Sequence, residues 1–293
     1  MNLQNIFSEI EKVDADIYDR LDTRRSAMKE FAKFTGKAAL AAVPLALGSM
    51  FKKAYGQTPT DVIATLQFAL TLEYLEAKFY QLGVAGSGVQ MESGAAGLSA
   101  LTKIRDHEFK HVTFLKAVIS SLGSTPTPEP KFDFTGGKGS NMGPFLGWET
   151  KYDVFLAMSQ AFEDTGVRAY KGAAGTLINN KIVLTAALNI HSVEARHASH
   201  IRQMRRARAT APGAITAAYV GDIKPWINLN ESNIGAGFQA AVQPSYNGEE
   251  ITVQNGINIV TVAGVSAIAA SASFDEPLSR EAVLSIVAPF IVP

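Results

Sequence analysis

The chain has 293 residues, 47% of them hydrophobic, so it is long enough to bury a substantial core and too apolar to be intrinsically disordered. Its 27 Lys and Arg residues balance its 27 Asp and Glu residues, which argues against nucleic-acid binding. It contains no cysteine, which excludes disulfides, thiolate metal sites and cysteine nucleophiles. Any bound metal must therefore be held by oxygen and nitrogen atoms.

The first 56 residues resemble a twin-arginine export signal. Arg24-Arg25 precedes an apolar run from Ala38 to Phe51, which is short for a bilayer span and is interrupted by Pro44. Two lysines and a small-residue end at Gly56 follow. We expect a signal removed near Gly56, a periplasmic or extracellular protein, and no stable membrane insertion after processing. The alternative is an amphipathic helix and a buried helix of a cytoplasmic protein.

Two helices are predicted in the sequence that follows. Apolar residues recur at helical spacing from about Thr60 to Leu82 and again from about Leu98 to Leu122, with glycine-rich sequence between the two runs. Three prolines and three glycines lie between Pro126 and Gly139, so no helix is expected in residues 124–147. This stretch therefore connects the second helix to a third.

Two more helices are predicted after this connection. The third begins near Trp148 or Lys151 and continues through Tyr170, and Asn179-Asn180 separates it from a fourth of about Ile182 to Ala209. We expect the arginines near the end of the fourth helix to be solvated and to match the helix dipole. They are Arg202, Arg205, Arg206 and Arg208.

Acids and histidines recur on these helices in a repeated order. A lone glutamate precedes a Glu-x-x-His motif, and the same order then occurs again. Residues three apart on a helix lie on one face, so each motif can direct a carboxylate and an imidazole at one point, where they could hold a metal. The lone acids are Glu73 and Glu163, and the motifs are Glu108 to His111 and Glu194 to His197. The order indicates a duplicated half-site.

This order resembles that of the ferritin-like di-iron and di-manganese carboxylate proteins, in which two helices each supply a Glu and two each supply Glu-x-x-His. The resemblance covers roughly residues 59–209, and within the family it points to secreted bacterial ferritin-like proteins, some of them desiccation-related. It implies an all-α fold with a ferritin-like four-helix bundle in residues 57–212. Residues 124–147 would then be the long crossover between helices two and three.

The resemblance also implies a ligand set for two ions of iron or manganese. The expected ligands are Glu73, Glu108, His111, Glu163, Glu194 and His197. Glu108 and Glu194 would bridge the two ions, whereas each histidine and each lone glutamate would bind one ion. No catalytic residue beyond these ligands is predicted.

Three residues beside the lone acids are candidates for supporting the site. Glu76 has no counterpart in the second half, because the position three after Glu163 is Gly166, and we expect it to lie near the ligands or at the surface. Tyr80 and Tyr170 each follow a lone glutamate by seven residues, two turns along the same face. Core packing is their favoured role, and hydrogen bonding to the ligands is the alternative.

The other histidines are less favoured as site residues. His191 and His200 flank the second Glu-x-x-His motif but point to opposite sides of the helix, so both cannot face the site. His191 could support the site or add a ligand beside Glu194, whereas His200 is expected to be exposed. His107 faces about 100° away from Glu108, which favours a packing or surface role.

Residues 213–293 differ in composition from the bundle and are read as a C-terminal extension. Asn255-Gly256 lies between alternating apolar residues and predicts a small hairpin. Short helices are expected at Val262 to Ser273 and at Ser279 to Val287. The extension should pack on the bundle or on a second subunit, in which case the chain would form a homodimer.

The resemblance implies redox chemistry at the dinuclear centre with dioxygen or peroxide, of the ferroxidase or oxidase kind. Two alternatives use the same residues. One is peroxide dismutation, as in manganese catalases. The other is a non-enzymatic protein of a stress or desiccation response, in which metal ions cross-link the bundle.

Overall fold

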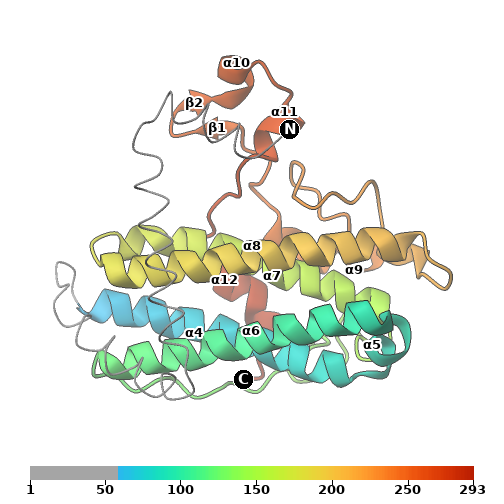
Figure 1. The fold of residues 1–293 in the computed structure, drawn as a ribbon, viewed down its shortest axis with the longest axis horizontal. Coiled ribbons are helices and arrows are strands. Elements are labelled where there is room, and N and C mark those ends of the chain that lie inside the picture. The colour runs from blue at the N-terminus through green and yellow to red at the C-terminus, as the bar shows by residue number, and fades with distance from the viewer. Residues whose placement is uncertain (1–58) are drawn as a thin grey trace, which may run out of the picture. The chain divides into compact units, whose positions relative to one another are not determined.

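The computed structural model describes residues 59–293, and the expected export signal lies outside the described residues (Figure 1). Four long helices dominate this part of the chain. They are α4 (Pro59–Ala85), α6 (Gly94–Ser121), α7 (Tyr152–Leu177) and α8 (Lys181–Ala209). α4 packs along α6 and α7 along α8, while α4 also contacts α7 and α6 contacts α8. The expected all-α four-helix bundle is confirmed. Within residues 59–293, no helix is long and apolar enough to cross a lipid bilayer.

The first helix is longer than predicted, and a short helix follows it. α4 continues through Gly83, where a Cβ atom would lie only 2.0 Å from a ring carbon of Phe155, so glycine is needed for close packing of α4 on α7. The glycine-rich connection then forms α5 (Ser87–Glu92), which the sequence did not predict.

An aromatic cluster joins the bundle to the crossover between α6 and α7. Phe79 of α4 is fully buried at its centre, and ring centroids lie between 4.9 and 5.4 Å from its own. These rings belong to Phe134, Trp148, Phe155 and Phe162. The crossover contains no helix over residues 124–147, as predicted. Its first residues are fastened to α4 by Gln67, whose side-chain amide donates to the carbonyl oxygen of Thr125 at 2.8 Å.

The C-terminal extension begins with the 3-10 helix η1 (Thr216–Ala218) and α9 (Ala236–Val242), neither of which was predicted. The 3-10 helix η2 (Gln243–Ser245) follows. The predicted hairpin is present as β1 (Val253–Gln254) and β2 (Ile257–Asn258), which pair in antiparallel register. Its turn residues Asn255 and Gly256 both have positive φ, the conformation that a tight two-residue turn requires.

Three short helices end the chain. The single helix predicted for Val262 to Ser273 is instead α10 (Ile259–Ala263) and α11 (Ala267–Ser271), because Gly264 adopts a left-handed conformation and ends α10. α12 (Arg280–Val287) agrees with the prediction, and the hydroxyl of Ser279 accepts a hydrogen bond from the amide of Ala282 as its N-cap. The 3-10 helix η3 (Ala288–Phe290) follows.

The prediction of a solvated arginine-rich end on α8 is wrong for three of its four residues. Arg206 is exposed, but Arg202 is 1% exposed and Arg205 is fully buried. The side chain of Arg208 is 10% accessible and is paired with Glu92 and Asp153. Arg202 forms a buried ion pair with Asp164 of α7. Arg205 donates to the carbonyl oxygens of Ala218 and Asn233 at 3.0 and 2.9 Å. These side chains are buried because the C-terminal extension covers α7 and this end of α8.

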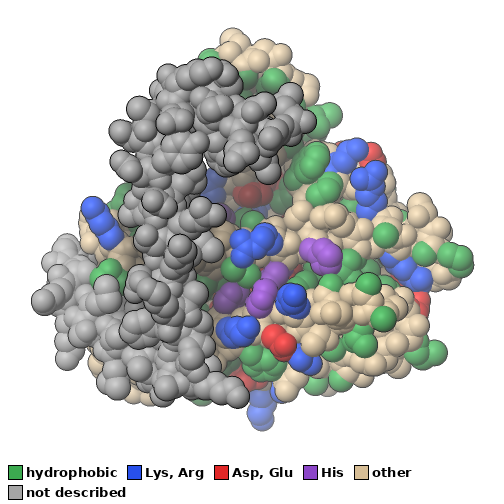
Figure 2. Space-filling view, in the orientation of Figure 1, with side chains coloured by type: hydrophobic (Ala, Val, Ile, Leu, Met, Phe, Trp, Pro, Cys, Tyr) green, Lys and Arg blue, Asp and Glu red, His purple; other side chains and the backbone are tan. Residues whose placement is uncertain are grey.

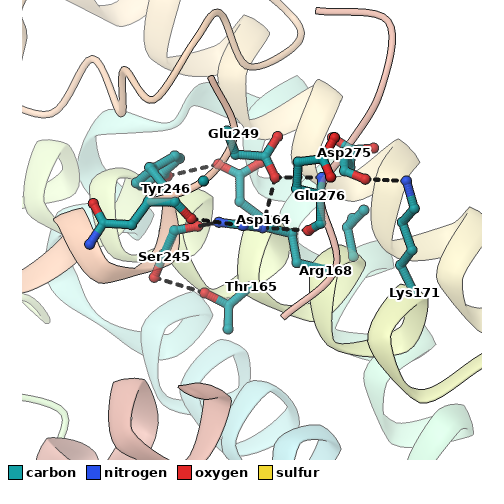
Figure 3. A network of polar contacts seen from close by, with 12 residues as sticks. Asp164, Thr165, Arg168, Lys171, Ser245, Tyr246, Glu249, Asp275 and Glu276 are labelled. Atoms are coloured by element: carbon teal, nitrogen blue, oxygen red, sulfur yellow. Dashed lines mark hydrogen bonds and ion pairs between the residues drawn. The ribbon is translucent and has the colours of Figure 1, made fainter. Parts of the chain in front are cut away.

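A third buried arginine, Arg168 of α7, binds further residues of the C-terminal extension (Figure 3). Its Nε lies 2.7 Å from Oε1 of Glu249, and its Nη1 donates to the carbonyl oxygen of Ser245 at 2.6 Å. Further donated bonds reach the carbonyl oxygens of Asn247 and Glu276. One guanidinium therefore joins two separate segments of the extension to the bundle.

Candidate metal centre

The six predicted ligands come together between the four long helices and are buried. The four glutamates are fully buried, and His111 and His197 are 8% and 5% exposed. They form two overlapping groups in which the candidate ligand atoms lie within 4.8 Å of one another: Glu73, Glu108, His111 and Glu194, and Glu108, Glu163, Glu194 and His197. Glu108 and Glu194 belong to both groups. The arrangement could therefore hold two cations with these two carboxylates shared between them.

Each histidine turns its Nδ1 toward three carboxylates. Nδ1 of His111 lies 3.1 Å from Oε2 of Glu73 and 3.0 Å from an oxygen of each shared glutamate. Nδ1 of His197 lies 2.9 Å from Oε1 of Glu108, 3.3 Å from Oε2 of Glu163 and 3.5 Å from Oε2 of Glu194. A ring nitrogen carries at most one hydrogen, so it cannot donate to three acceptors in full. A cation among these atoms would be coordinated by all of them.

Several buried atoms of this cluster have no hydrogen-bond partner among the described residues. They are Oε1 of Glu108, Oε2 of Glu163, both carboxylate oxygens of Glu194 and Nδ1 of His197. A buried polar atom without a partner costs free energy, and coordination to a cation would remove that cost. The four carboxylates carry four negative charges when ionised, which two divalent cations would balance. Oxygen and imidazole donors together suit iron or manganese, so the residues fit such ions.

In the metal-free cluster, bound protons offset part of the negative charge of the carboxylates. Burial raises the pKa of Glu73 to about 8 and that of Glu163 well above its usual value. Burial alone would lower the pKa of both histidines, but the neighbouring carboxylates raise it, chiefly Glu73 for His111 and Glu163 for His197. Burial would raise the pKa of Glu194, yet the close approach of both histidine side chains lowers it. Metal binding must therefore displace protons.

Two tyrosines orient the lone glutamates across the bundle. The hydroxyl of Tyr80 on α4 donates to Oε1 of Glu163 on α7 at 2.5 Å, and the hydroxyl of Tyr170 on α7 donates to Oε1 of Glu73 on α4. Each glutamate thus keeps Oε2 directed at the cluster. The hydroxyl contacts show that these buried tyrosines have more than the packing role that the sequence favoured.

Glu76 and His191 lie outside both ligand groups. Glu76 is 4% exposed, so a surface role for it is wrong. Its carboxylate occupies space next to Gly166 of α7, where a Cβ atom would lie 3.2 Å from Oε1 of Glu76. His191 is half-buried, and its Nδ1 donates to the carbonyl oxygen of Val167 at 2.9 Å, which leaves that nitrogen unavailable to a metal.

His107 is the site residue that the sequence analysis missed. It is half-buried on α6, and its Nδ1 lies 2.9 Å from Nε2 of His197 on α8. The prediction considered only the angle between His107 and Glu108 on their own helix, whereas the partner comes from the neighbouring one. His200 is exposed, as expected.

One comparison with known proteins agrees with this geometry. A family model described as a ferritin-like domain matches residues 61–207, half of the chain. No curated protein and no solved structure matches. The narrower resemblance to secreted, desiccation-related proteins stays a prediction. The match spans the four long helices and contains all six clustered residues, and the chain belongs to the ferritin-like domain family.

Proposed function

We propose that the bundle binds two ions of iron or manganese and uses them in redox chemistry with dioxygen or peroxide. One observation carries the proposal: the two groups of buried ligands share Glu108 and Glu194. Such sharing holds two cations close together, which separate sites would not do. The protein would accordingly act as an oxidase or ferroxidase.

Each ligand has a distinct part in this proposal. Glu108 and Glu194 would be shared by the two ions, and Nδ1 of His111 or His197 would complete each position. Glu73 and Glu163 would each hold one ion through Oε2, while a tyrosine hydroxyl donates a hydrogen bond to Oε1. The bound pair would supply reversible one-electron oxidation and reduction of each ion. The chain itself orients the donors before binding and excludes bulk water, since all four carboxylates are fully buried.

A second candidate is a metal-stabilised protein without turnover. It is favoured by the origin of the ligands, since the four long helices each contribute at least one. Two bound ions would cross-link all four helices and stabilise the fold by binding to the folded state alone. Peroxide dismutation, the reaction of manganese catalases, would require the same ligands. It differs from the first candidate because peroxide itself is both oxidised and reduced, with no other reductant consumed.

The first experiment is elemental analysis of purified protein beside Glu108→Gln and Glu194→Gln. Glu129→Gln is the matched control, because Glu129 is exposed on the crossover. We expect about two iron or manganese ions per chain in the unaltered protein and the control, and their loss in both bridging variants. An unaltered protein that contains no metal, and whose melting temperature added iron or manganese leaves unchanged, would contradict the proposal.

Turnover assays then separate the candidates. The metal-loaded protein is mixed with ferrous iron under air, and separately with hydrogen peroxide. Oxidation of iron supports the first proposal, and release of dioxygen from peroxide alone would indicate dismutation. Bound metal with neither reaction, together with a raised melting temperature, would favour the stabilising role.

A further inference from the structure

The two halves of the proposed centre differ in how their histidines are supported from outside. Figure 2 shows histidine side chains gathered on one face of the molecule, along the junction of α6 and α8. His107 of α6 and His197 of α8 are in contact with each other. His197 contributes to a ligand group through Nδ1. His107 belongs to neither group, so its contact with His197 needs a separate explanation.

The two rings are placed for a hydrogen bond and not for face-to-face stacking. Their planes differ by 19°, and their centroids are 5.2 Å apart. That separation is close to the 2.9 Å between Nδ1 of His107 and Nε2 of His197 plus the distances from each nitrogen to its ring centre. The two nitrogens therefore lie on the line between the centroids. A ring N–H, which lies in the ring plane, points at the lone pair of the other ring in this arrangement.

We propose that His107 is a positioning residue for His197 and makes one of the two cation positions bind more tightly than the other. This inference rests on the proposed metal centre. A histidine that binds a cation through Nδ1 carries its hydrogen on Nε2. That hydrogen is donated to Nδ1 of His107, which fixes the tautomer of His197 and turns its Nδ1 toward Glu108, Glu163 and Glu194.

The other half of the centre has no such support. Nδ1 of His111 faces the carboxylates, and no residue in 59–293 forms a hydrogen bond with its Nε2. The repeat shows the same difference: His107 precedes Glu108, whereas Val193 precedes Glu194, and valine has no side-chain acceptor. His111 is also somewhat more exposed, with 11% of its side chain accessible against 6% for His197. The position of His197 is therefore the better organised one before an ion arrives.

The experiment titrates metal-free protein with Mn²⁺ and follows the free ion by electron paramagnetic resonance. The unaltered protein should bind two ions in two steps of different affinity. In His107→Leu, the tighter step should weaken by about tenfold to a hundredfold, the usual effect of removing a group that orients a metal-binding histidine. The weaker step should not change.

Two variants serve as controls for structure and for histidine content. His107→Gln keeps an acceptor oxygen near Nε2 of His197 and should restore much of the lost affinity. His200→Leu removes an exposed histidine three residues after His197 on α8 and should bind like the unaltered protein. Equal melting temperatures of the metal-free proteins would show that the substitutions leave the fold intact. If His107→Leu fails to fold, the same Mn²⁺ titration is made with His107→Gln and His107→Ala, and the tighter step should be weaker in His107→Ala.

A direct readout of the tautomer comes from nitrogen NMR of the protein loaded with Zn²⁺, which is diamagnetic. The Nε2–H signal of His197 should be protected from solvent exchange in the unaltered protein and in His200→Leu, and exposed in His107→Leu. Two ions bound with unchanged affinities and unchanged exchange in His107→Leu would overturn this inference while leaving the metal centre intact. An equal weakening of both steps would overturn it too. An unaltered protein that binds no ion would overturn both proposals.

Discussion

Helices α4 and α7 have equivalent places in the repeat, yet the chain covers them in different ways. Each supplies a lone glutamate to the cluster and a tyrosine to the glutamate of the other. α4 is covered by the crossover, through aromatic side chains and neutral hydrogen bonds. α7 is covered by the C-terminal extension, through the buried ion pair of Arg168 with Glu249 and through Asp164, which accepts a hydrogen bond from the hydroxyl of Tyr246. The second kind of cover depends on partners that a local sequence pattern does not reveal.

The charged contacts between α7 and the C-terminal extension cost free energy of desolvation, which is regained only when every charged group has its partners. Arg168 and Glu249 are each 1% exposed. Both charges lose hydration on burial, which lowers the pKa of Arg168 and raises that of Glu249 to about 7. The ion pair and the carbonyl oxygens around Arg168 compensate for that loss only while all partners are present. We therefore expect this cover to be the more sensitive of the two to a single substitution.

The largest effect is expected for Arg168→Ala, which leaves Glu249 buried without its charge partner. The free energy of unfolding should fall by about 3–5 kcal/mol, as measured by urea denaturation. Limited proteolysis should also cut the C-terminal extension, residues 213–293, faster. The double variant Arg168→Ala, Glu249→Gln should recover part of the loss, because it removes the unpaired charge. A loss below about 1 kcal/mol in the single variant would show that the charged cover is not what holds the extension.

Tyr80→Phe and Tyr170→Phe test whether the inner faces of the two helices are as alike as the geometry indicates. Each variant removes one hydroxyl hydrogen bond to a ligand carboxylate. In metal-loaded protein, where the carboxylates are ionised, each should lower the free energy of unfolding by about 1.5–3 kcal/mol. The two losses, measured side by side in urea, should agree within error. Clearly different losses in the two variants would mean that the segments packed on the outer sides of α4 and α7 affect the ligand cluster between the helices.

Glu76 is the third test, because only α4 has a carboxylate at this position. Burial raises the pKa of Glu76 well above its usual 4.5, and Glu194 and Glu108 add to the effect. Between pH 4.5 and the raised pKa, folded metal-free protein keeps a proton that the unfolded chain has lost, so stability falls as pH rises. Glu76→Gln should reduce that slope by about 1.4 kcal/mol per pH unit, measured by urea unfolding between about pH 5 and 7. Glu129→Gln should leave the slope unchanged.

Helical periodicity predicted that each Glu-x-x-His pair shares one face. The resemblance of the repeated order to the ferritin-like proteins then implied that Glu73, Glu108 to His111, Glu163 and Glu194 to His197 come together. The residues that were misjudged have partners on other segments. Arg202 pairs with Asp164, and His107 meets a histidine that lies 90 positions later in the chain. A run of arginines at a helix end has the same pattern whether water or a distant segment covers it, so only the tertiary structure distinguishes the two cases.

The smallest effect is expected where the neutral cover of α4 is broken. Gln67 donates from its amide to the carbonyl oxygen of Thr125, and its Oε1 accepts from the amide of Thr127, both at 2.8 Å. These groups are partly exposed, so water can replace each bond when the side chain is removed. Gln67→Ala should lower the free energy of unfolding by only about 1 kcal/mol in urea.

Gln67→Glu refines this last test, because it keeps the acceptor for Thr127 and loses only the donor to Thr125. Its loss should lie between those of the unaltered protein and Gln67→Ala, with no faster proteolysis of residues 124–147. If Gln67→Ala instead destabilised the protein as much as Arg168→Ala, buried charge could not be the reason for the sensitivity of the extension. The loss of any side chain that attaches a long irregular segment to the bundle would then destabilise the protein, whether that side chain is charged or neutral.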